Sequence, residues 1–392
     1  MYIFRAIACV CMCLCTRLCS LGTAAIENEE AITTKVVYKD EVSVEAVVRY
    51  INENYGFVSV TSDENLKDSV SLKAARFFKD EHLQLPAKSL CGADDPVDCV
   101  YCSVRYLLKH MPESDVGRLS VEYIGENVGL ALVARQCFPW ASATNVPWNV
   151  FLNEVLPYAS LAEPRDNWRY TLFRYMRKVV EASNIQTSID AAIISNAKAW
   201  DIVSPRIRFA AAPPNKLNHY SPFEVMKTRN ASCTGLSIFL TCALRSIGVP
   251  ARVAGTPHWN SGLKACPHGD ADPPCGNHNW VEVYAGKEWH FVNQAGTEGK
   301  LDVGWFFPGS TEHQIANSKN HSIFASSWAD TASLAADARS SKFYKLNHEF
   351  TNFPMVWNWE NNDIPGWDVT EWYHWKYNHN RSFSNSFGKW EF

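Results

Sequence analysis

Residues 233–250 place the firmest constraint on how this chain folds. Apolar side chains recur there at helical spacing and form one stripe: Leu236, Leu240, Ala243, Leu244 and Ile247. Gly248 follows the stripe as a typical residue after a helix end, and Pro250 prevents the helix from continuing. Asn230 and Ser232 are residue types that cap helix N-termini. The pattern predicts a helix that begins at or next to Cys233 and buries one face.

Cys233 stands at the predicted start of this helix, a position that activates thiols. The positive end of the helix dipole and the unpaired N–H groups of the first turn both lower the pKa of a thiol toward the reactive thiolate. The other interpretation of a single cysteine is a small buried side chain, and it suits Cys242 inside the helix. Its position makes Cys233 the candidate nucleophile.

Two short runs of β-branched and aromatic residues, 279–284 and 288–292, flank a turn signal at 286–287. If a two-residue loop joins them as a hairpin, His278 and Asn293 lie on the same face as diagonal neighbours about 7 Å apart or less. A three-residue loop would place these two side chains on opposite faces. The two-residue loop therefore predicts that an imidazole and a carboxamide meet.

These three side chains are what an activated-thiol catalyst needs. A carboxamide oxygen of Asn293 can accept the proton on one nitrogen of the His278 ring, which leaves the other nitrogen free to take the proton of Cys233. A lone histidine is more often structural, but this one stands at a strand start with an amide close by on the partner strand. The spacing therefore indicates a catalytic triad.

Four segments, KTRNASCTGLSIFL, GVPARVAGTPHW, NHNWVEVY and EWHFVNQAG, closely resemble the transglutaminase-like superfamily, which shares the papain-like core of cysteine catalysts. The resemblance implies an α+β fold in which the cysteine opens a helix packed on an antiparallel sheet. It also implies that Cys233 is the nucleophile, His278 the general base and acid, and Asn293 the orienting group. The family usually has aspartate in the third place, and asparagine orients the imidazole while stabilising its charged form less.

The segments VLPYASLAEPRDNWR and LDVGWFFPGSTEH also resemble stretches that precede and follow the catalytic core in this family. Helical patterns broken at prolines dominate the chain before the core. We therefore expect a largely α-helical N-terminal lobe at 26–200, a catalytic core at 201–335, and an aromatic, β-rich C-terminal extension at 336–392. A cleft between the helical and sheet-bearing parts is the expected substrate site.

Residues 1–25, MYIFRAIACVCMCLCTRLCSLGTAA, have the form of a secretory signal peptide: an early arginine, an apolar run and small residues at the end. A single-pass anchor is the other interpretation, but the apolar run is short for a bilayer and Arg17 interrupts it. The sequence thus predicts a secreted or secretory-lumen protein with no stable membrane span once the signal is removed.

Five of the 13 cysteines lie in this leader, and an oxidising compartment allows others to pair. Cys266 and Cys275 flank a short loop before the candidate histidine and form the best local disulfide candidate. Together with His268 and His278 they could also be read as a zinc site, an interpretation that we rank below the disulfide because the compartment favours oxidation and His278 already has a catalytic role. Four more cysteines could pair two by two, with a connectivity that the sequence does not fix: Cys91, Cys99, Cys102 and Cys137.

The composition of the chain limits the kinds of partner that we expect it to bind. A net charge of −4 and a pI near 6.3 argue against a nucleic-acid-binding surface. No cofactor motif is present, and no metal or cofactor is expected. Trp259 and Trp280 are candidates for the wall of a substrate cleft, and the sequons at Asn320 and Asn380 are candidates for glycosylation, whereas the one at Asn230 lies against the thiol.

Two functions fit these features. The first is an acyl-transfer enzyme that attacks amide or peptide bonds through a thioester, with hydrolysis as a simpler outcome than crosslinking, because aminolysis requires a site that excludes water. The second is a secreted, catalytically weak or inactive module that binds a peptide or glycan in the same cleft. Retention of both Cys233 and His278 favours the enzyme, and the asparagine at 293 favours the module.

Overall fold

The computed structural model describes residues 42–55, 79–80, 98–211, 220–260, 276–294, 300–329, 353 and 364–376. The predicted signal peptide at 1–25, the disulfide candidate Cys266–Cys275 with its zinc alternative, Cys91 and the sequon at Asn380 lie outside the described residues.

Helices dominate the chain before the candidate nucleophile. The α-helices are α2 (Val44–Tyr55), α4 (Cys99–Lys109), α5 (Val121–Cys137), α6 (Trp148–Glu154), α7 (Trp168–Ala182), α8 (Ser188–Lys198), α9 (Pro222–Thr228) and α10 (Cys233–Ser246). Short 3-10 turns occur at Glu113–Asp115, Pro139–Ala141, Ala199–Ile202 and Thr311–His313. Helices α2, α4, α5, α6 and α7 lie in the part of the chain before the core where helical patterns were expected.

The strands form one main antiparallel sheet. Its order is β5-β4-β3-β6-β7, and every neighbouring pair is antiparallel. These strands are β3 (Ala251–Thr256), β4 (His278–Ala285), β5 (Glu288–Val292), β6 (Phe324–Ser326) and β7 (Gly366–Asp368). Two further strands, β1 (Arg208–Phe209) and β2 (Asn230–Ala231), pair in parallel just before α10. The expected mixture of helices with an antiparallel sheet is confirmed.

Helix α10 has the limits that its end signals predict. The Ser232 side chain accepts a hydrogen bond from the N–H of Gly235, so the helix begins at Cys233. At the other end Gly248 has a φ of +74° and donates to the carbonyl of Arg245, while Val249 donates to the carbonyl of Leu244. These two bonds satisfy the last carbonyls of the helix in a Schellman motif. The helix then packs on β3 and β4.

The β4–β5 hairpin has the predicted register. Ala285 pairs with Glu288 and Val281 with Val292, so the loop between the strands contains two residues. These are Gly286 and Lys287, whose φ angles are +58° and +70°. Positive φ at both central positions matches the right-handed twist of the flanking strands. The continuation of this register sets Asn293 diagonally from His278.

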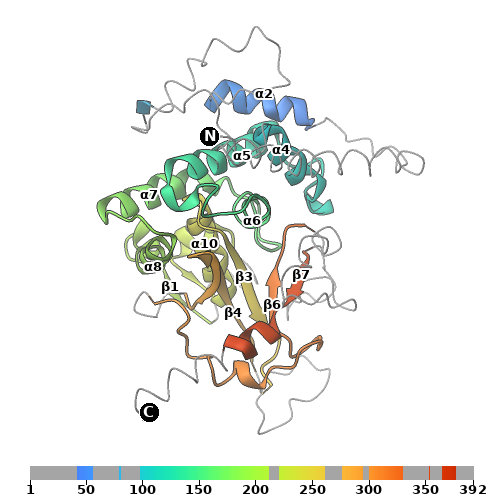
Figure 1. Ribbon diagram of the computed structural model, residues 1–392, viewed down its shortest axis with the longest axis vertical. Helices are drawn as coiled ribbons and strands as arrows, with labels where there is room; N and C mark the ends of the chain where they lie inside the picture. Colours follow the sequence, from blue (N-terminus) through green and yellow to red (C-terminus); the bar gives the residue numbers. More distant parts are fainter. Residues whose placement is uncertain are drawn as a thin grey trace, which may run out of the picture.

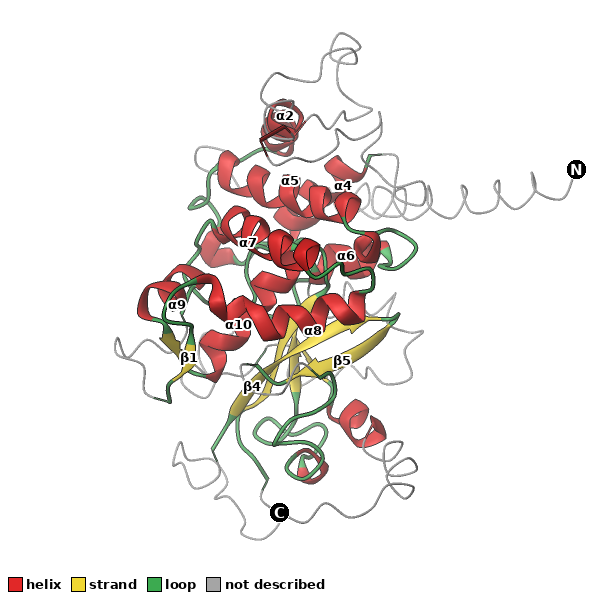
Figure 2. Ribbon diagram, turned by 90° about the vertical axis from the view of Figure 1, so that its left-hand side faces the viewer, coloured by secondary structure: helices red, strands yellow, loops and turns green. Residues whose placement is uncertain are grey.

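Layers of helices stack on one side of the sheet (Figure 1). Helix α2 packs on α4 and α5, α5 packs on α7, and α7 packs on α10, which covers the sheet together with α8. Figure 2 shows the same succession from the side. A single apolar cluster runs from Val47 in α2 to Val283 in β4, and a smaller aromatic cluster covers the opposite face of the sheet. The helices before the core therefore share one interior with α10.

A buried charge network ties the helical part to the sheet. Glu154, at the end of α6, lies 3.6 Å from Arg252 of β3 and 3.8 Å from Arg245 of α10. Arg252 also contacts Glu282 of β4 at 2.8 Å. Burial raises the pKa of Glu154 to about 7 even though both arginines oppose this shift. The cost of removing the Glu154 carboxylate from water is thus greater than the stabilisation that the two arginines provide.

The predicted pairing of the cysteines is only partly met. Cys99 is disulfide-bonded. Within the described residues Cys102 and Cys137 are in no disulfide bond, so the expectation that these cysteines pair two by two is wrong for both.

Asn320 is half-buried, and its glycosylation stays a prediction. None of the helices that the structure describes has the length and hydropathy needed to cross a membrane.

The buried network gives a testable prediction. Replacement of Arg252 by Met removes the charge between Glu282 and Glu154 and leaves two buried carboxylates without their closest cation. We expect the free energy of unfolding to fall by about 3–5 kcal/mol in urea titrations at neutral pH. The matched control is Arg206→Met, because Arg206 pairs with Asp201 at the surface, where an ion pair contributes roughly 0–1 kcal/mol. Equal losses in both variants would contradict the assigned role of Arg252.

Candidate active site

Cys233 is the first residue of α10, and its sulfur lies against strand β4. Groups around the sulfur lower the pKa of the Cys233 thiol: the backbone N–H groups of Asn279, Thr234 and Cys233 and the side chain of Thr234. These donors favour the thiolate, as expected for a helix start. Burial outweighs them, however, and raises the pKa of the Cys233 thiol above its ordinary value. The expectation of a lowered thiol pKa is therefore wrong: the resting group is a thiol.

Two side chains fasten the start of α10 to β4. The Thr234 hydroxyl donates to the side-chain oxygen of Asn279 at 2.7 Å. The Gln294 carboxamide donates to the carbonyl of Cys233 at 3.1 Å and to the carbonyl of Asn279 at 2.7 Å. Gly255 of β3 makes this approach possible, since a Cβ there would meet the Asn279 side chain and the His278 carbonyl. The nucleophile is thus held at the first residues of the strand.

His278 begins strand β4 and is hydrogen-bonded by Asn293, as the hairpin register predicts. Nε2 of the ring is buried without a hydrogen-bond partner, so the carboxamide acts on Nδ1. The bond with Asn293 favours the protonated ring, but burial dominates and lowers the pKa of His278 to about 4. At neutral pH the ring is an uncharged base.

Asn293 and His278 are therefore brought together, and the start of α10 is fastened to Asn279, which follows His278. The alternation of a strand points Asn279 toward α10 and His278 toward the opposite, aromatic face. In the described structure no hydrogen bond joins the sulfur to Nε2, so the thiol and the imidazole are not brought into direct contact. Both groups are uncharged at rest.

Aromatic rings enclose the imidazole. The ring centroid of His278 lies 4.9 Å from that of Trp305, 5.2 Å from that of Phe306 and 5.7 Å from that of Trp280. Trp280 is 0 % exposed and donates its indole N–H to Tyr373, so the prediction that it forms a cleft wall is wrong. Trp259, 8 % exposed, stacks parallel to Trp280 and belongs to the same enclosure.

Trp305 is the site residue that the sequence analysis did not single out. It is 63 % exposed and touches both His278 and Trp259, which makes it the solvent-facing aromatic of the site. The segment around it resembles a stretch after the family's core. The sequence of a segment rich in glycine and aromatic residues does not, however, show which aromatic side chain is buried and which is exposed. Only the folded position of 303–307 distinguishes it from Phe306.

Helix α8 also contributes to the site, which the sequence analysis did not predict. The Asn196 carboxamide of this helix donates to the backbone carbonyl of Asn293 at 3.2 Å. Gln294, the next residue, uses its amide N–H groups on two carbonyls and so has none left for a substrate oxyanion. The N–H of Cys233 in the first helical turn remains the candidate oxyanion donor.

No group of three or more His, Cys, Asp or Glu side chains within the described ranges could hold a metal ion.

Residues 186–294 match the family model of the transglutaminase-like superfamily. The matched segment extends from α8 to the end of the β4–β5 hairpin and contains Cys233, His278 and Asn293. The resemblance that the sequence motifs suggested is thereby confirmed. No curated protein and no solved structure matches the chain.

The burial of His278 predicts how stability depends on pH. Between about pH 6.5 and pH 4 the unfolded chain binds a proton on this ring and the folded protein does not. The free energy of unfolding therefore falls as the pH falls through this window, by about 3 kcal/mol from this residue. Urea titrations across the window should show that His278→Gln loses less stability than the wild type. Glu154 is present in both proteins, so its contribution to the pH dependence of stability cancels when the two slopes are compared. Identical slopes would contradict a buried, neutral His278.

Proposed function

We propose that this protein is a cysteine-dependent enzyme of acyl transfer that acts on amide or peptide bonds, with Cys233 as nucleophile, His278 as base and acid, and Asn293 as orienting residue. One observation carries the proposal. The helix start that carries the sulfur is fastened to β4 at Asn279, the residue directly after His278, while Asn293 hydrogen-bonds the His278 ring. The transglutaminase-like match over the same residues supports it.

The neutral resting pair favours a general-base mechanism. As the sulfur attacks the substrate carbonyl, its proton passes to the unpartnered Nε2 of His278, and the new C–S bond leaves a negative charge on the carbonyl oxygen. The N–H of Cys233 lies where it can stabilise this oxyanion. Collapse of the intermediate breaks the C–N bond, and the proton on His278 leaves with the amine, so that a thioester remains on Cys233.

Hydrolysis is the simpler second half-reaction. Water gives a proton to His278 as its oxygen attacks the thioester, which releases the acid and restores the thiol. An amine in place of water would give transfer, but a crosslinking reaction requires exclusion of water from the thioester. The strongly exposed Trp305 beside the imidazole supports a site open to solvent. We therefore propose a hydrolase on protein or peptide substrates.

Trp305 supports a substrate with an apolar side chain near the cleaved bond. Its ring is 63 % exposed, although it packs against His278 and Trp259. A large exposed aromatic at a catalytic base offers surface that a ligand can cover. The compartment proposed from the leader at 1–25 is the extracellular space or the secretory lumen, which fits a peptide hydrolase with N-x-Ser/Thr sequons.

One observation favours the alternative function, a binding module without turnover. The pKa of the Cys233 thiol is raised and that of His278 is lowered, so that no preformed thiolate–imidazolium pair awaits a substrate. In such a module the same aromatic surface would hold a peptide or glycan and Cys233 would stay unmodified. Trapping of an acyl group on the sulfur separates the two functions.

The proposed function predicts the products of a peptide library. The protein lacking 1–25 is incubated with peptides and an added amine, and mass spectrometry records cleavage, deamidation, amine incorporation and acyl adducts. We expect hydrolysis products and a transient acyl group on Cys233. Cys233→Ala and His278→Ala should each lower turnover by at least about a thousandfold, whereas the matched control Cys137→Ala should retain it. Turnover that survives Cys233→Ala would remove the mechanism, and an unmodified Cys233 with bound peptide would establish the module.

The raised thiol pKa predicts slow alkylation of the resting enzyme. The rate at which iodoacetamide labels Cys233, followed by peptide mapping, should keep rising with pH up to and beyond the ordinary thiol value of 9.0, because only the thiolate reacts. A rate that reaches a plateau below neutral pH would indicate a preformed ion pair and contradict the neutral resting state.

A further inference from the structure

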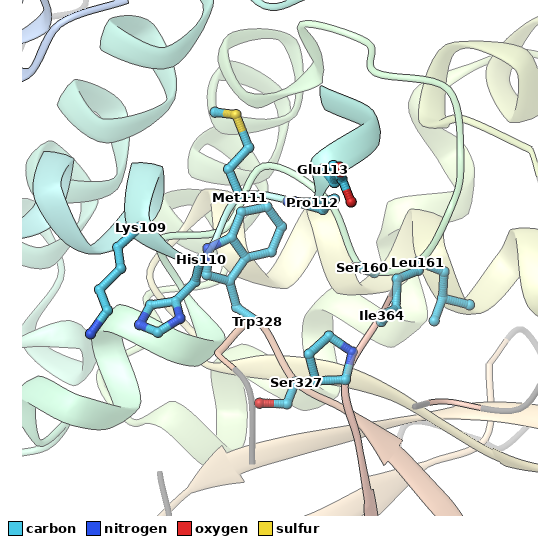
Figure 3. Close-up of a pocket in the computed structure, with 11 residues that line it drawn as sticks. Lys109, His110, Met111, Pro112, Glu113, Ser160, Leu161, Ser327, Trp328 and Ile364 are labelled. Atoms are coloured by element: carbon cyan, nitrogen blue, oxygen red, sulfur yellow. The ribbon is translucent and has the colours of Figure 1, made fainter. Parts of the chain in front are cut away.

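The two edges of the main sheet are covered in different ways. Beside β7, a pocket of about 320 Å³ separates the sheet from the end of α4 (Figure 3). Beside β5, the other edge strand, residues from later in the chain bind the strand directly, and Asp302 is the residue that binds Phe291. The edge that carries the second strand of the catalytic hairpin is therefore closed by hydrogen bonds.

Asp302 satisfies both backbone groups of Phe291. The N–H of Asp302 donates to the carbonyl of Phe291 at 2.9 Å, and the Oδ1 atom of Asp302 accepts from the N–H of Phe291 at 3.0 Å. Alternate residues of an edge strand direct these two groups away from the neighbouring strand, where they need other partners. Asp302 makes both bonds with a φ of +60°, a conformation that aspartate tolerates better than most residues.

The second oxygen of Asp302 holds two basic side chains. Its Oδ2 atom lies 2.7 Å from Nδ1 of His290 and 2.7 Å from Nζ of Lys376. Burial on its own would raise the pKa of Asp302, but His290 and Lys376 together lower this pKa below its ordinary value. The carboxylate therefore stays charged, and keeps these partners, in neutral and mildly acidic solution.

A tight turn begins two residues after Asp302. The N–H of Phe307 donates to the carbonyl of Gly304 at 3.1 Å, which places Trp305 and Phe306 at the two central positions of a β-turn. A Cβ at residue 304 would lie 2.9 Å from the Phe306 ring, so glycine gives this ring the room to fold back against the turn. The turn thus presents two neighbouring aromatic rings.

Both rings of the turn lie against the imidazole of His278. The Phe306 ring also packs on the ring of Phe291, at a centroid distance of 5.4 Å. Phe291 is the residue whose backbone Asp302 binds. The bonds of Asp302 therefore fix one end of the turn directly beside the surface on which its rings pack.

The charge state of His278 depends on this enclosure. Burial lowers the pKa of His278 to about 4, and the bond with Asn293 acts in the opposite direction. Of the three rings that the described structure places against the imidazole, those of Trp305 and Phe306 come from the turn, and only that of Trp280 comes from β4 itself. A displaced turn would expose the imidazole to water, which favours its protonated form.

We propose that Asp302 is a positioning residue of the catalytic base: through Phe291, His290 and Lys376 it anchors the turn at 304–307, and this turn encloses the imidazole of His278. The inference rests on the proposed function only where it names His278 the base. The uncharged imidazole is the form that can take a proton from a thiol, so the anchor maintains the base in its working form.

The experiment is nuclear magnetic resonance of the protein with isotope-labelled histidine, which follows the protonation of each ring as the pH changes. The signal of His278 is the one that disappears in His278→Gln. In the wild type this signal should stay nearly constant between about pH 8 and pH 5.5, because the pKa is about 4. In Asp302→Ala the midpoint should rise above about 5, toward the ordinary value of 6.5.

Two variants separate the anchor from a general loss of stability. Gly304→Ala leaves the carboxylate intact but displaces the Phe306 ring, and it should also raise the midpoint of His278. Asp201→Ala is the matched control, because Asp201 pairs with Arg206 at 3.2 Å on the surface, and it should leave the midpoint at about 4. Urea titrations verify that each variant is folded.

The proposal is overturned if the midpoint stays at about 4 in folded Asp302→Ala and Gly304→Ala, or if Asp201→Ala raises it equally. If Asp302→Ala does not fold, Lys376→Met decides in its place: it removes one of the two basic partners and should raise the midpoint by a smaller amount. An unchanged midpoint there would likewise overturn the anchor.

The pH dependence of turnover distinguishes this proposal from the proposed function. In an active enzyme, the acid limb of kcat/KM should move to higher pH in Asp302→Ala together with the midpoint of His278. A raised midpoint with an unmoved limb would support the anchor and remove His278 as the base. A raised midpoint in a protein without turnover would support the anchor and remove the enzyme.

Discussion

The attachment of the start of α10 to strand β4 is the constraint on which the candidate site depends. Thr234 and Gln294 bind the two segments at Asn279, and Gly255 leaves room for the contact. The backbone N–H of Asn279 lowers the pKa of the Cys233 thiol. Any shift of the helix along the sheet would break these bonds together, so the position of the nucleophile follows from polar contacts that are buried and paired.

Buried arginines extend this constraint to the helical part of the chain. Arg169 of α7 and Arg245 of α10 donate to the carbonyl of Glu154, at the end of α6, and to carbonyls of the irregular segment 155–159 that follows it. Burial lowers the pKa of Arg169 to about 9, which measures the cost of this arrangement. A guanidinium can bind several carbonyls at once. The segment that resembles a stretch before the family's core thus joins α6 to α7 and is held to α10 by Arg245.

Burial has two opposite effects at the candidate site. The aromatic rings around His278 fix the orientation of the imidazole, and α10 fixes the sulfur, which favours catalysis by positioning. The same enclosure disfavours both charged forms, since it raises the pKa of the thiol and lowers that of the imidazole. A neutral pair is the result, and transfer of the proton has to accompany attack on the substrate. The asparagine at 293 fits this state, because an uncharged acceptor suits an uncharged ring.

The sequence by itself determined the limits of α10, the two-residue loop of the hairpin and the meeting of His278 with Asn293. Each of these follows from capping residues, turn residues or strand alternation within a few positions of the chain. The tertiary structure decided the charge states of Cys233 and His278, the complete burial of Trp280 and the exposure of Trp305. These depend on segments at 301–307 and 364–376 that fold back over β4 from far along the chain. The burial of a side chain depends on neighbours that are far along the chain, so local sequence patterns do not reveal it.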